Sequence, residues 1–500
     1  MPPIDRPAGR ARIGLFSRKG LFRIHAWIGL VLGYLLYVIC LSGTMAVFGH
    51  ELAWLGDPAK RVAAPAAGTP RISWQGLYDR VAAAHPDLSI LGLAMDPDDL
   101  RRPAWALVAG REGDLRRVPV DPWTGEAGPQ KAGLDLHLWL RVFHKQLYVV
   151  PGVTGVHGAL IVGALALPLL VALVTGLITT RRWWQAAVIL RMGRSARLFW
   201  SDLHRFAGVW SMLIGILICL TGLWYLVETA ADTAGAGFAE GPALPGIAPA
   251  QVQAQAQAQA APLIDLDLAV ARAAEAFPAL VVTTIMPPRR PGHPLVLAGH
   301  GDGVLLRDGT EGVALDPTTG AVLQIRDAAG LTLLQRWVNT ADPLHFGTFG
   351  GVATRILWLV AGLLTSAGIL AGLIGAWLRL DRRQAGGPPG RVRMGRVRMG
   401  ALATILPCLG LLLAAIHGSW VYGVVAARPK LLPGEIASIG LAPGEMAILV
   451  VILAALAAPL PLWLRLTCRR AAVQSPPSSS PDAGRSRRRL AISAQSSGGG

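Results

Sequence analysis

Long runs of apolar residues, separated by polar stretches, dominate the pattern of this 500-residue chain. A helix needs about 20 residues to cross the roughly 30 Å apolar core of a bilayer, and six of the runs are long enough. The pattern therefore predicts an α-helical integral membrane protein with six transmembrane helices. They are expected at residues 25–50, 153–180, 203–228, 350–379, 401–425 and 446–467.

Two long polar stretches, residues 51–150 and 229–345, follow the first and the third of these spans. In each stretch an amphipathic helical pattern and a proline precede a β-rich run. Each stretch also contains Asp-Pro-x-Thr-Gly, at 121–125 and 316–320, between alternating apolar residues, which is typical of a hairpin turn. We therefore expect two external α+β domains.

The chain contains one structural unit twice. IHAWIGLVLGYLLYVICLSG at 24–43 matches LHRFAGVWSMLIGILICLTG at 203–222 in the spacing of a histidine, two glycines and a cysteine. FHKQLYVVPG at 143–152 and LHFGTFGG at 344–351 each place a histidine before a returning span. Two copies of span, domain and span in one orientation imply a pseudo-two-fold axis along the membrane normal. The last two spans have no counterpart.

The composition excludes an ordinary soluble enzyme, because 52% of the residues are hydrophobic, 15% are charged and the mean hydropathy is +0.45. Lysine and arginine collect in the N-terminus (1–24), in the loops 181–202 and 380–400, and in the tail 468–500, which we expect to be disordered. This asymmetry predicts that both termini are cytoplasmic and that the first span is an anchor, not a removed signal peptide. The net charge of +17 is assigned to contacts with membrane lipid, and no nucleic-acid partner is expected.

Four histidines occupy matching positions in the two units. His25 and His204 begin spans that lead outward, whereas His144 and His345 precede spans that return, so one pair is expected at each membrane surface. A single interfacial histidine is more often structural, but the duplication favours a shared role. Neutral imidazoles from facing helices are suited as the two axial ligands of a haem iron. The sequence therefore predicts two haem b groups, which would form an electron path across the membrane.

The glycines of the repeat are open to two interpretations. Gly29 and Gly208 follow their histidines by one helical turn and fit either clearance for a flat macrocycle or close helix packing. Gly43 and Gly222 follow the same histidines by eighteen residues, which is five whole turns, and are expected on the same helical face.

His157 is the substitute for His144 as an outer ligand. It follows His144 by thirteen residues, but Pro-Gly at 151–152 is expected to break a shared helix. His50 ends the first span on the outer side, and His137 shares the stripe of His144 if that segment is helical.

The four cysteines form no CxxC motif, which argues against a disulfide framework or a zinc site. The chain also lacks GxGxxG after a strand, a Walker sequence and HExxH. Electrons are therefore expected from a partner, either membrane quinol or a cytoplasmic reductase.

These motifs make the chain resemble the PepSY-associated transmembrane helix family of bacterial iron-regulated membrane proteins. The resemblance rests on HAWIG at 25–29, FHKQL at 143–147, DLHRFAGVW at 202–210 and DPLHFGTFGG at 342–351. Many relatives carry arginine after the first histidine, where this chain has Ala26. The last two spans lie outside the family pattern.

The resemblance implies a multi-pass protein of the bacterial inner membrane with periplasmic PepSY-like domains, and some relatives are haem-containing ferric-siderophore reductases. The family's histidine positions match His25, His144, His204 and His345. The leading hypothesis is a haem-containing electron-transfer protein that reduces ferric siderophore iron. The alternatives are a non-enzymatic regulator of periplasmic peptidases and a component of a siderophore or metal permease.

Overall fold

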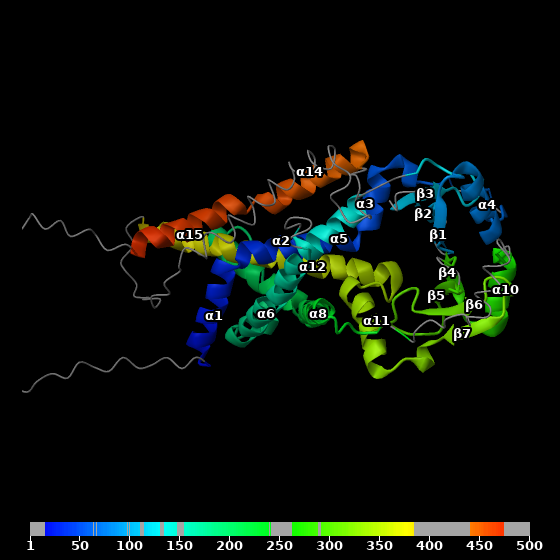
Figure 1. The fold of residues 1–500 in the computed structure, drawn as a ribbon. Coiled ribbons are helices and arrows are strands. Elements are labelled where there is room, and N and C mark those ends of the chain that lie inside the picture. The colour runs from blue at the N-terminus through cyan, green and yellow to red at the C-terminus, as the bar shows by residue number, and fades with distance from the viewer. Residues whose placement is uncertain are drawn as a thin grey trace, which may run out of the picture.

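The computed structural model describes most of the chain between residues 16 and 474. Not described are residues 1–15, 64, 67, 98, 100, 111–114, 131–134, 148–154, 240, 242–262, 289–291, 385–440 and 475–500. The predicted span 401–425 and nearly all of the predicted tail therefore lie outside the described residues. Figure 1 shows a group of long helices with a helix-covered sheet at one end.

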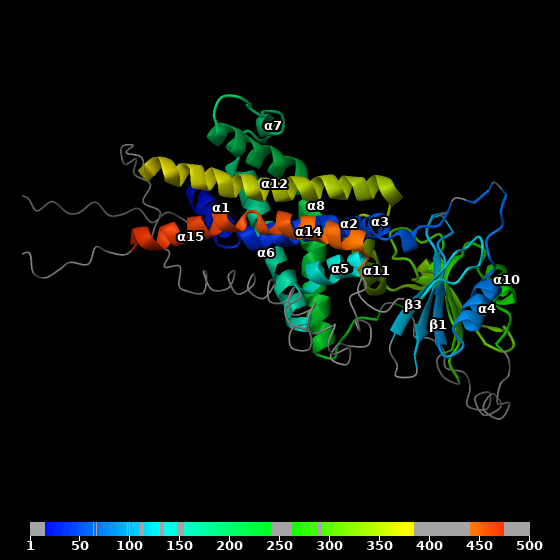
Figure 2. The ribbon, with the colours of Figure 1, turned by 90° about the horizontal axis from the view of Figure 1, so that it is seen from above.

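Four segments of the described chain are long and apolar enough to cross a membrane, or up to five if a bent pair counts as one span. The bent pair comprises α1 (Arg18–Val31) and α2 (Gly33–Val47). The other segments are α6 (Gly155–Thr179), α8 (Ala196–Thr233), α12 (Gly351–Gln384), and α14 (Pro443–Ala457) together with α15 (Leu460–Gln474). Figure 2 shows α14 and α15 following each other along one line, and α15 packs on α12.

The first span differs from the single helix that the apolar pattern predicted. α1 and α2 meet at Leu32 with a bend of 71°. The halves contact different partners, because α1 packs on α6, whereas α2 packs on α12 and α5 (Leu136–Gln146). The expectation that Gly43 shares a helical face with His25 is therefore wrong, while the unbroken α8 keeps Gly222 on the face of His204.

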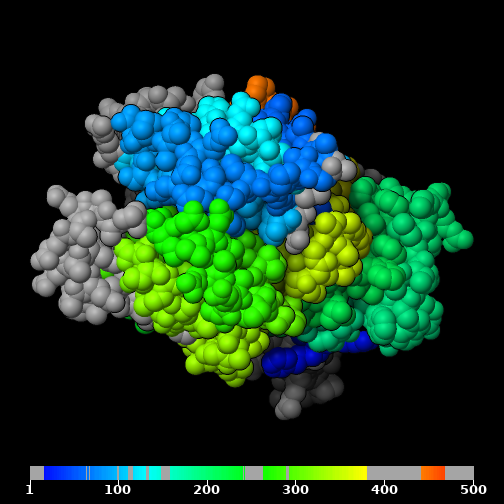
Figure 3. All heavy atoms as spheres, turned by 90° about the vertical axis from the view of Figure 1, so that its right-hand side faces the viewer, coloured from blue at the N-terminus to red at the C-terminus, as the bar shows by residue number. Residues whose placement is uncertain are grey.

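The external segments differ from two separate domains, because their strands form one antiparallel sheet in the order β3-β2-β1-β4-β5-β6-β7. The halves join where β1 pairs with β4, with Leu93 opposite Ile285. The first half contributes β1 (Ser89–Ala94), β2 (Ala104–Ala109) and β3 (Leu115–Val120). The second contributes β4 (Val281–Met286), β5 (Leu295–His300), β6 (Glu311–Leu315) and β7 (Val322–Arg326). Figure 3 shows the two halves in direct contact.

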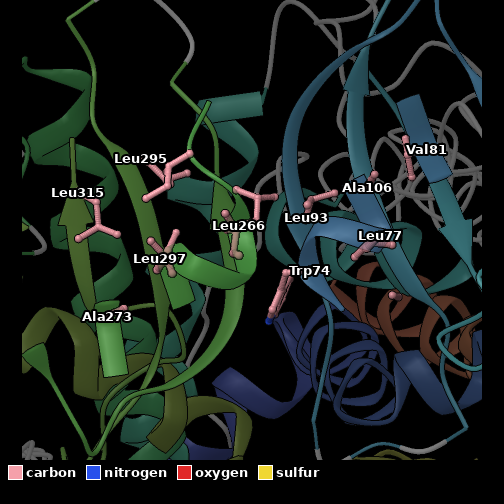
Figure 4. Close-up of a cluster of buried hydrophobic side chains, with 14 of the residues drawn as sticks. Trp74, Leu77, Val81, Leu93, Ala106, Leu266, Ala273, Leu295, Leu297 and Leu315 are labelled. Atoms are coloured by element: carbon pink, nitrogen blue, oxygen red, sulfur yellow. The ribbon is translucent and has the colours of Figure 1, made fainter. Parts of the chain in front are cut away.

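The two halves also share one hydrophobic core, to which both covering helices contribute. α4 (Trp74–Ala84) and α10 (Leu266–Ala276) place apolar side chains against the strands, as Figure 4 shows for Leu77 and Leu266. At the N-termini of these helices, Trp74 N–H donates to Asp267 and Leu266 N–H donates to Gln75, each at 2.9 Å. A small sheet with an open edge is marginal alone, so joining β1 to β4 removes an edge and enlarges the core.

The structure confirms the repeated turn motif. The carboxylates of Asp121 and Asp316 each accept hydrogen bonds from the backbone N–H groups two and three residues later. Gly125 and Gly320 have φ of 71° and 70°, in the left-handed region where glycine is favoured.

Short helices connect the sheet to the spans. α5 and α11 (Leu333–Phe346) precede α6 and α12 and carry His144 and His345. The other short elements are α3 (Gly49–Gly56), η1 (Pro58–Lys60), α7 (Trp183–Ala186) and η2 (Ala328–Gly330).

Candidate functional site: two facing histidine pairs

The structure brings the four matching histidines together as two pairs. We call His25 and His204 the inner pair, and His144 and His345 the outer pair, after the surfaces expected for them. The ring centroids of the inner pair are 5.8 Å apart at an interplanar angle of 65°. Those of the outer pair are 6.3 Å apart at 38°.

Each ring of the inner pair rests against the returning helix of its own repeat. The Nδ1 atom of His25 lies 2.9 Å from the carbonyl oxygen of Ala172 in α6. The Nδ1 atom of His204 lies 2.7 Å from the carbonyl oxygen of Gly368 in α12. A carbonyl oxygen only accepts, so both Nδ1 atoms carry the proton and, in the neutral rings, both Nε2 atoms carry a lone pair.

A glycine lies one turn beyond each of these carbonyls, in contact with the ring. A Cβ atom added at Gly176 would lie 3.2 Å from His25, and one at Gly372 would lie 3.1 Å from His204. Both glycines belong to a Gly-Leu-Ile sequence, at 176–178 and 372–374, which repeats the seat in the two units.

A cavity of about 1290 Å³ is lined by both rings of the inner pair. This volume lies just above the upper end of the range typical of ligand and cofactor sites. A Cβ atom at Gly29 or Gly208, which also line the cavity, would meet no atom within 4 Å. These two glycines therefore border open space, and the geometry favours clearance for a ligand over close helix packing.

The outer pair is seated against the outward helices, again within each repeat. The Nδ1 atom of His144 lies 3.1 Å from the carbonyl oxygen of Ile39 in α2, so this nitrogen also donates. The Nδ1 atom of His345 lies 2.8 Å from the hydroxyl of Thr221 in α8. That hydroxyl donates its proton to the carbonyl of Leu217 at 3.0 Å and therefore accepts from His345.

All four neutral rings thus share one tautomer, with Nδ1–H bonded inside the protein. In the described part of the chain, no hydrogen bond engages the Nε2 atom of any of the four. A bonded Nδ1–H fixes the orientation of a ring and raises the basicity of its Nε2 atom, which is the usual arrangement for a histidine that binds a metal.

The spacing within each pair fits a shared metal. A metal–imidazole bond is roughly 2 Å and a ring nitrogen lies about 1 Å from the ring centre, so two rings on opposite sides of one metal have centroids about 6 Å apart. The observed 5.8 and 6.3 Å agree with this value. The open cavity beside the inner pair adds space for a macrocycle, so the residues around that pair fit haem, and the outer pair matches it in ring spacing and tautomer.

The protonation of the outer pair suits ligand binding. Burial lowers the pKa of His144 to about 4. Burial and the neighbouring His144 lower the pKa of His345 to about 3. Both rings are therefore neutral near pH 7 and keep the lone pair that a metal requires.

Comparison with known proteins agrees with this architecture. The family described as the PepSY-associated TM region matches residues 22–379, which include both pairs. The chain belongs to this family. It is therefore a multi-pass membrane protein. No curated protein matches the chain closely enough to be counted as a relative.

Three further histidines stand out in the sequence, at the outer end of the first span and around His144. His157 lies in the first turn of α6, in a helix separate from α5, and its side chain is outside the described residues. His50 and His137 stack on each other, with ring centroids 3.5 Å apart at 18°.

The groups that seat the rings of this PepSY-associated protein could not be predicted from the sequence. Every residue has a backbone carbonyl, so the residue types at Ala172 and Gly368 do not show that these carbonyls bond the rings. Two sequence features could have indicated these groups. One is the Gly-Leu-Ile sequence that occurs in both repeats. The other is the hydroxyl residue just before Gly43 and Gly222, in Leu-Ser-Gly at 41–43 and Leu-Thr-Gly at 220–222. Ser42 lies 3.4 Å from Nδ1 of His144, where Thr221 bonds His345.

Gly43 provides a test of the outer pair with a control in the other repeat. A Cβ atom at Gly43 would lie 2.6 Å from Cε1 of His144, whereas one at Gly222 would meet only Ala166, at 3.2 Å. We expect Gly43→Ala to displace the His144 ring and to lower the haem content by about half, since one of two sites is lost. Gly222→Ala should retain the haem. Equal haem contents in the two purified variants would contradict the assignment.

Proposed function

We propose that the chain is a haem-containing electron-transfer protein of the bacterial inner membrane that reduces ferric iron held in a periplasmic siderophore. The observation that carries the proposal is the two histidine pairs, in which all four rings bond through Nδ1 inside their own repeat and keep the Nε2 lone pair. His25 and His204 would hold one haem b, and His144 and His345 the other.

Haem supplies one-electron chemistry, in which the iron alternates between Fe(III) and Fe(II). The residues of this chain would hold and orient the two groups. The partners of Nδ1 fix each ring, and Gly29 and Gly208 leave space beside the inner pair. His204 and Thr221, which bonds His345, are seventeen residues apart on the unbroken α8, or about 25 Å along its axis. This separation is close to the thickness of the apolar core.

The acceptor is proposed from chemistry. A ferric ion in an oxygen-rich chelate gains one electron and becomes ferrous, and the lower charge weakens its bonds to hard oxygen ligands. Release then requires no cleavage of the chelator. Electrons would come from quinol or from a cytoplasmic reductase.

Reconstitution in liposomes tests the proposal. The full chain is supplied with a quinol analogue on the inner side and a ferric hydroxamate on the outer side, and a ferrous-specific chelator records the product. We expect ferrous iron to appear only when protein, donor and ferric chelate are all present. The same low rate with and without protein, while the haem is reduced, would contradict the proposed acceptor. Transport of intact ferric chelate into the vesicles would instead favour a permease.

A further inference from the structure

The helix pair α14 and α15 follows the family match, which ends at residue 379. This pair is broken near Pro459, and proline has no N–H group. The carbonyl of Ala455, four residues earlier, therefore has no helical donor. The hydroxyl of Tyr37 in α2 donates to this carbonyl at 3.0 Å. A side chain of the first span thus provides the hydrogen bond that the Ala455 carbonyl loses at the break between α14 and α15.

In the same way, a side chain of the last span bonds a free backbone carbonyl at the break in the first span. Leu30 lies in the last turn of α1, where carbonyls lack helical partners. The fully buried indole of Trp463 in α15 donates to the Leu30 carbonyl at 2.9 Å. Tyr34, just after the break, donates to the carbonyl of Leu456 at 3.1 Å. The two broken helices therefore cap each other, which matters in an apolar layer where water is not available as a partner.

The other end of the pair is tied to α5 through charges. The carboxylate of Glu445, fully buried in α14, lies 2.9 Å from Nζ of Lys60. The same ammonium group lies 2.9 Å from Asp135. Asp135 is the N-cap of α5, where it accepts from Leu138 N–H at 2.8 Å. Removing the partner of a buried carboxylate is strongly destabilising. The ion pairs from Glu445 through Lys60 to Asp135 therefore fix the start of the helix that carries His144.

The second repeat does not use these contacts. α8 is continuous past the position that corresponds to Leu32, and needs no capping there. α11 begins with its own capping box, in which Thr332 and Gln335 bond each other's backbone N–H groups. The hydrogen bonds and ion pairs described above thus join the C-terminal pair to the first repeat, at α1, at α2 and at the start of α5, while α15 also packs on α12.

We propose that α14 and α15 form a clamp that positions both histidines of the first repeat. Trp463 holds the break in the first span and so sets the direction of α1 and His25. Glu445, through Lys60, holds the start of α5 and so sets His144. Both are positioning residues, since they act through these helices. The inference deepens the proposed function and rests on it for its haem readout, but the arrangement of the helices is independent of haem.

Trp463→Phe tests the first end of the clamp, because it keeps an aromatic ring and removes the N–H donor. Trp377→Phe is the matched control, since Trp377 packs in the same apolar cluster and its buried Nε1 has no hydrogen-bond partner among the described residues. In the full chain we expect Trp463→Phe to shift the midpoint potential and electron paramagnetic resonance signal of the inner haem alone. Amide hydrogen exchange at residues 28–36 should become roughly fivefold faster or more, and Trp377→Phe should change neither.

Glu445→Gln tests the second end, with the exposed Glu275→Gln as its control. We expect a shift of the outer haem alone and faster exchange at residues 135–140. Variants His204→Ala and His345→Ala identify which signal belongs to which haem.

The crossed pattern, with each variant affecting a different haem, supports the clamp. Loss of thermal stability in both variants, with both haem signals and both exchange patterns unchanged, would overturn it. If the wild-type chain holds no haem, the proposed function is wrong. The clamp is then tested by hydrogen exchange alone, and unchanged exchange rates at residues 28–36 and 135–140 would refute it.

Discussion

Replacing His204 with alanine is expected to remove one of two haems and to stop electron transfer across the membrane. His204 supplies one of the two rings of the inner pair, and its Nδ1–H is fixed by the carbonyl of Gly368. Without this ring, His25 alone would remain of the pair beside the cavity, and we expect one imidazole to hold haem weakly. The reduced-minus-oxidised absorbance should fall by roughly half.

The control for this variant is His300→Ala, which removes an exposed histidine of the seven-stranded sheet. His300→Ala should leave the haem content and electron transfer unchanged. Retention of both haems in His204→Ala would refute the inner pairing.

Replacing His345 with alanine is expected to separate the two halves of the path. This variant loses the outer ligand that Thr221 seats at 2.8 Å, while the inner pair keeps both of its own seats. The remaining haem should still be reduced by the donor. The rate at which the external ferric chelate is reduced should fall by about 100-fold or more, because the proposed path then has no outer haem to pass the electron to the chelate.

The measurement for His345→Ala compares haem reduction by a quinol analogue with the release of ferrous iron outside the vesicles. Fast haem reduction with little ferrous product is the expected result. An unchanged rate of ferrous release would show that the acceptor does not receive electrons from the outer pair. His300→Ala again serves as the control.

The repeat in the sequence was sufficient to select the histidines that the structure places in pairs. Its spacing assigns His25 and His204 to equivalent helices, and the returning spans supply His144 and His345 by the same logic. Those four positions depend on local periodicity and on duplication, both of which can be read along the chain. Their role as haem ligands remains a prediction.

Other features depended on contacts between distant segments. The bend at Leu32 lies within an uninterrupted apolar run, and it is stabilised by Trp463, more than 400 residues away in the sequence. The single sheet depends on β1 pairing with β4 across the whole of α8. Apolar patterns predict where helices and strands form, but they do not predict which distant elements pack or pair with each other.

The haem content of the purified full chain tests the central claim most directly. The protein is isolated from haem-replete bacteria, and its dithionite-reduced minus oxidised spectrum is compared with the protein concentration. Two bis-histidine sites predict b-type bands and about two haems per chain. A colourless preparation from the same cells would contradict the account.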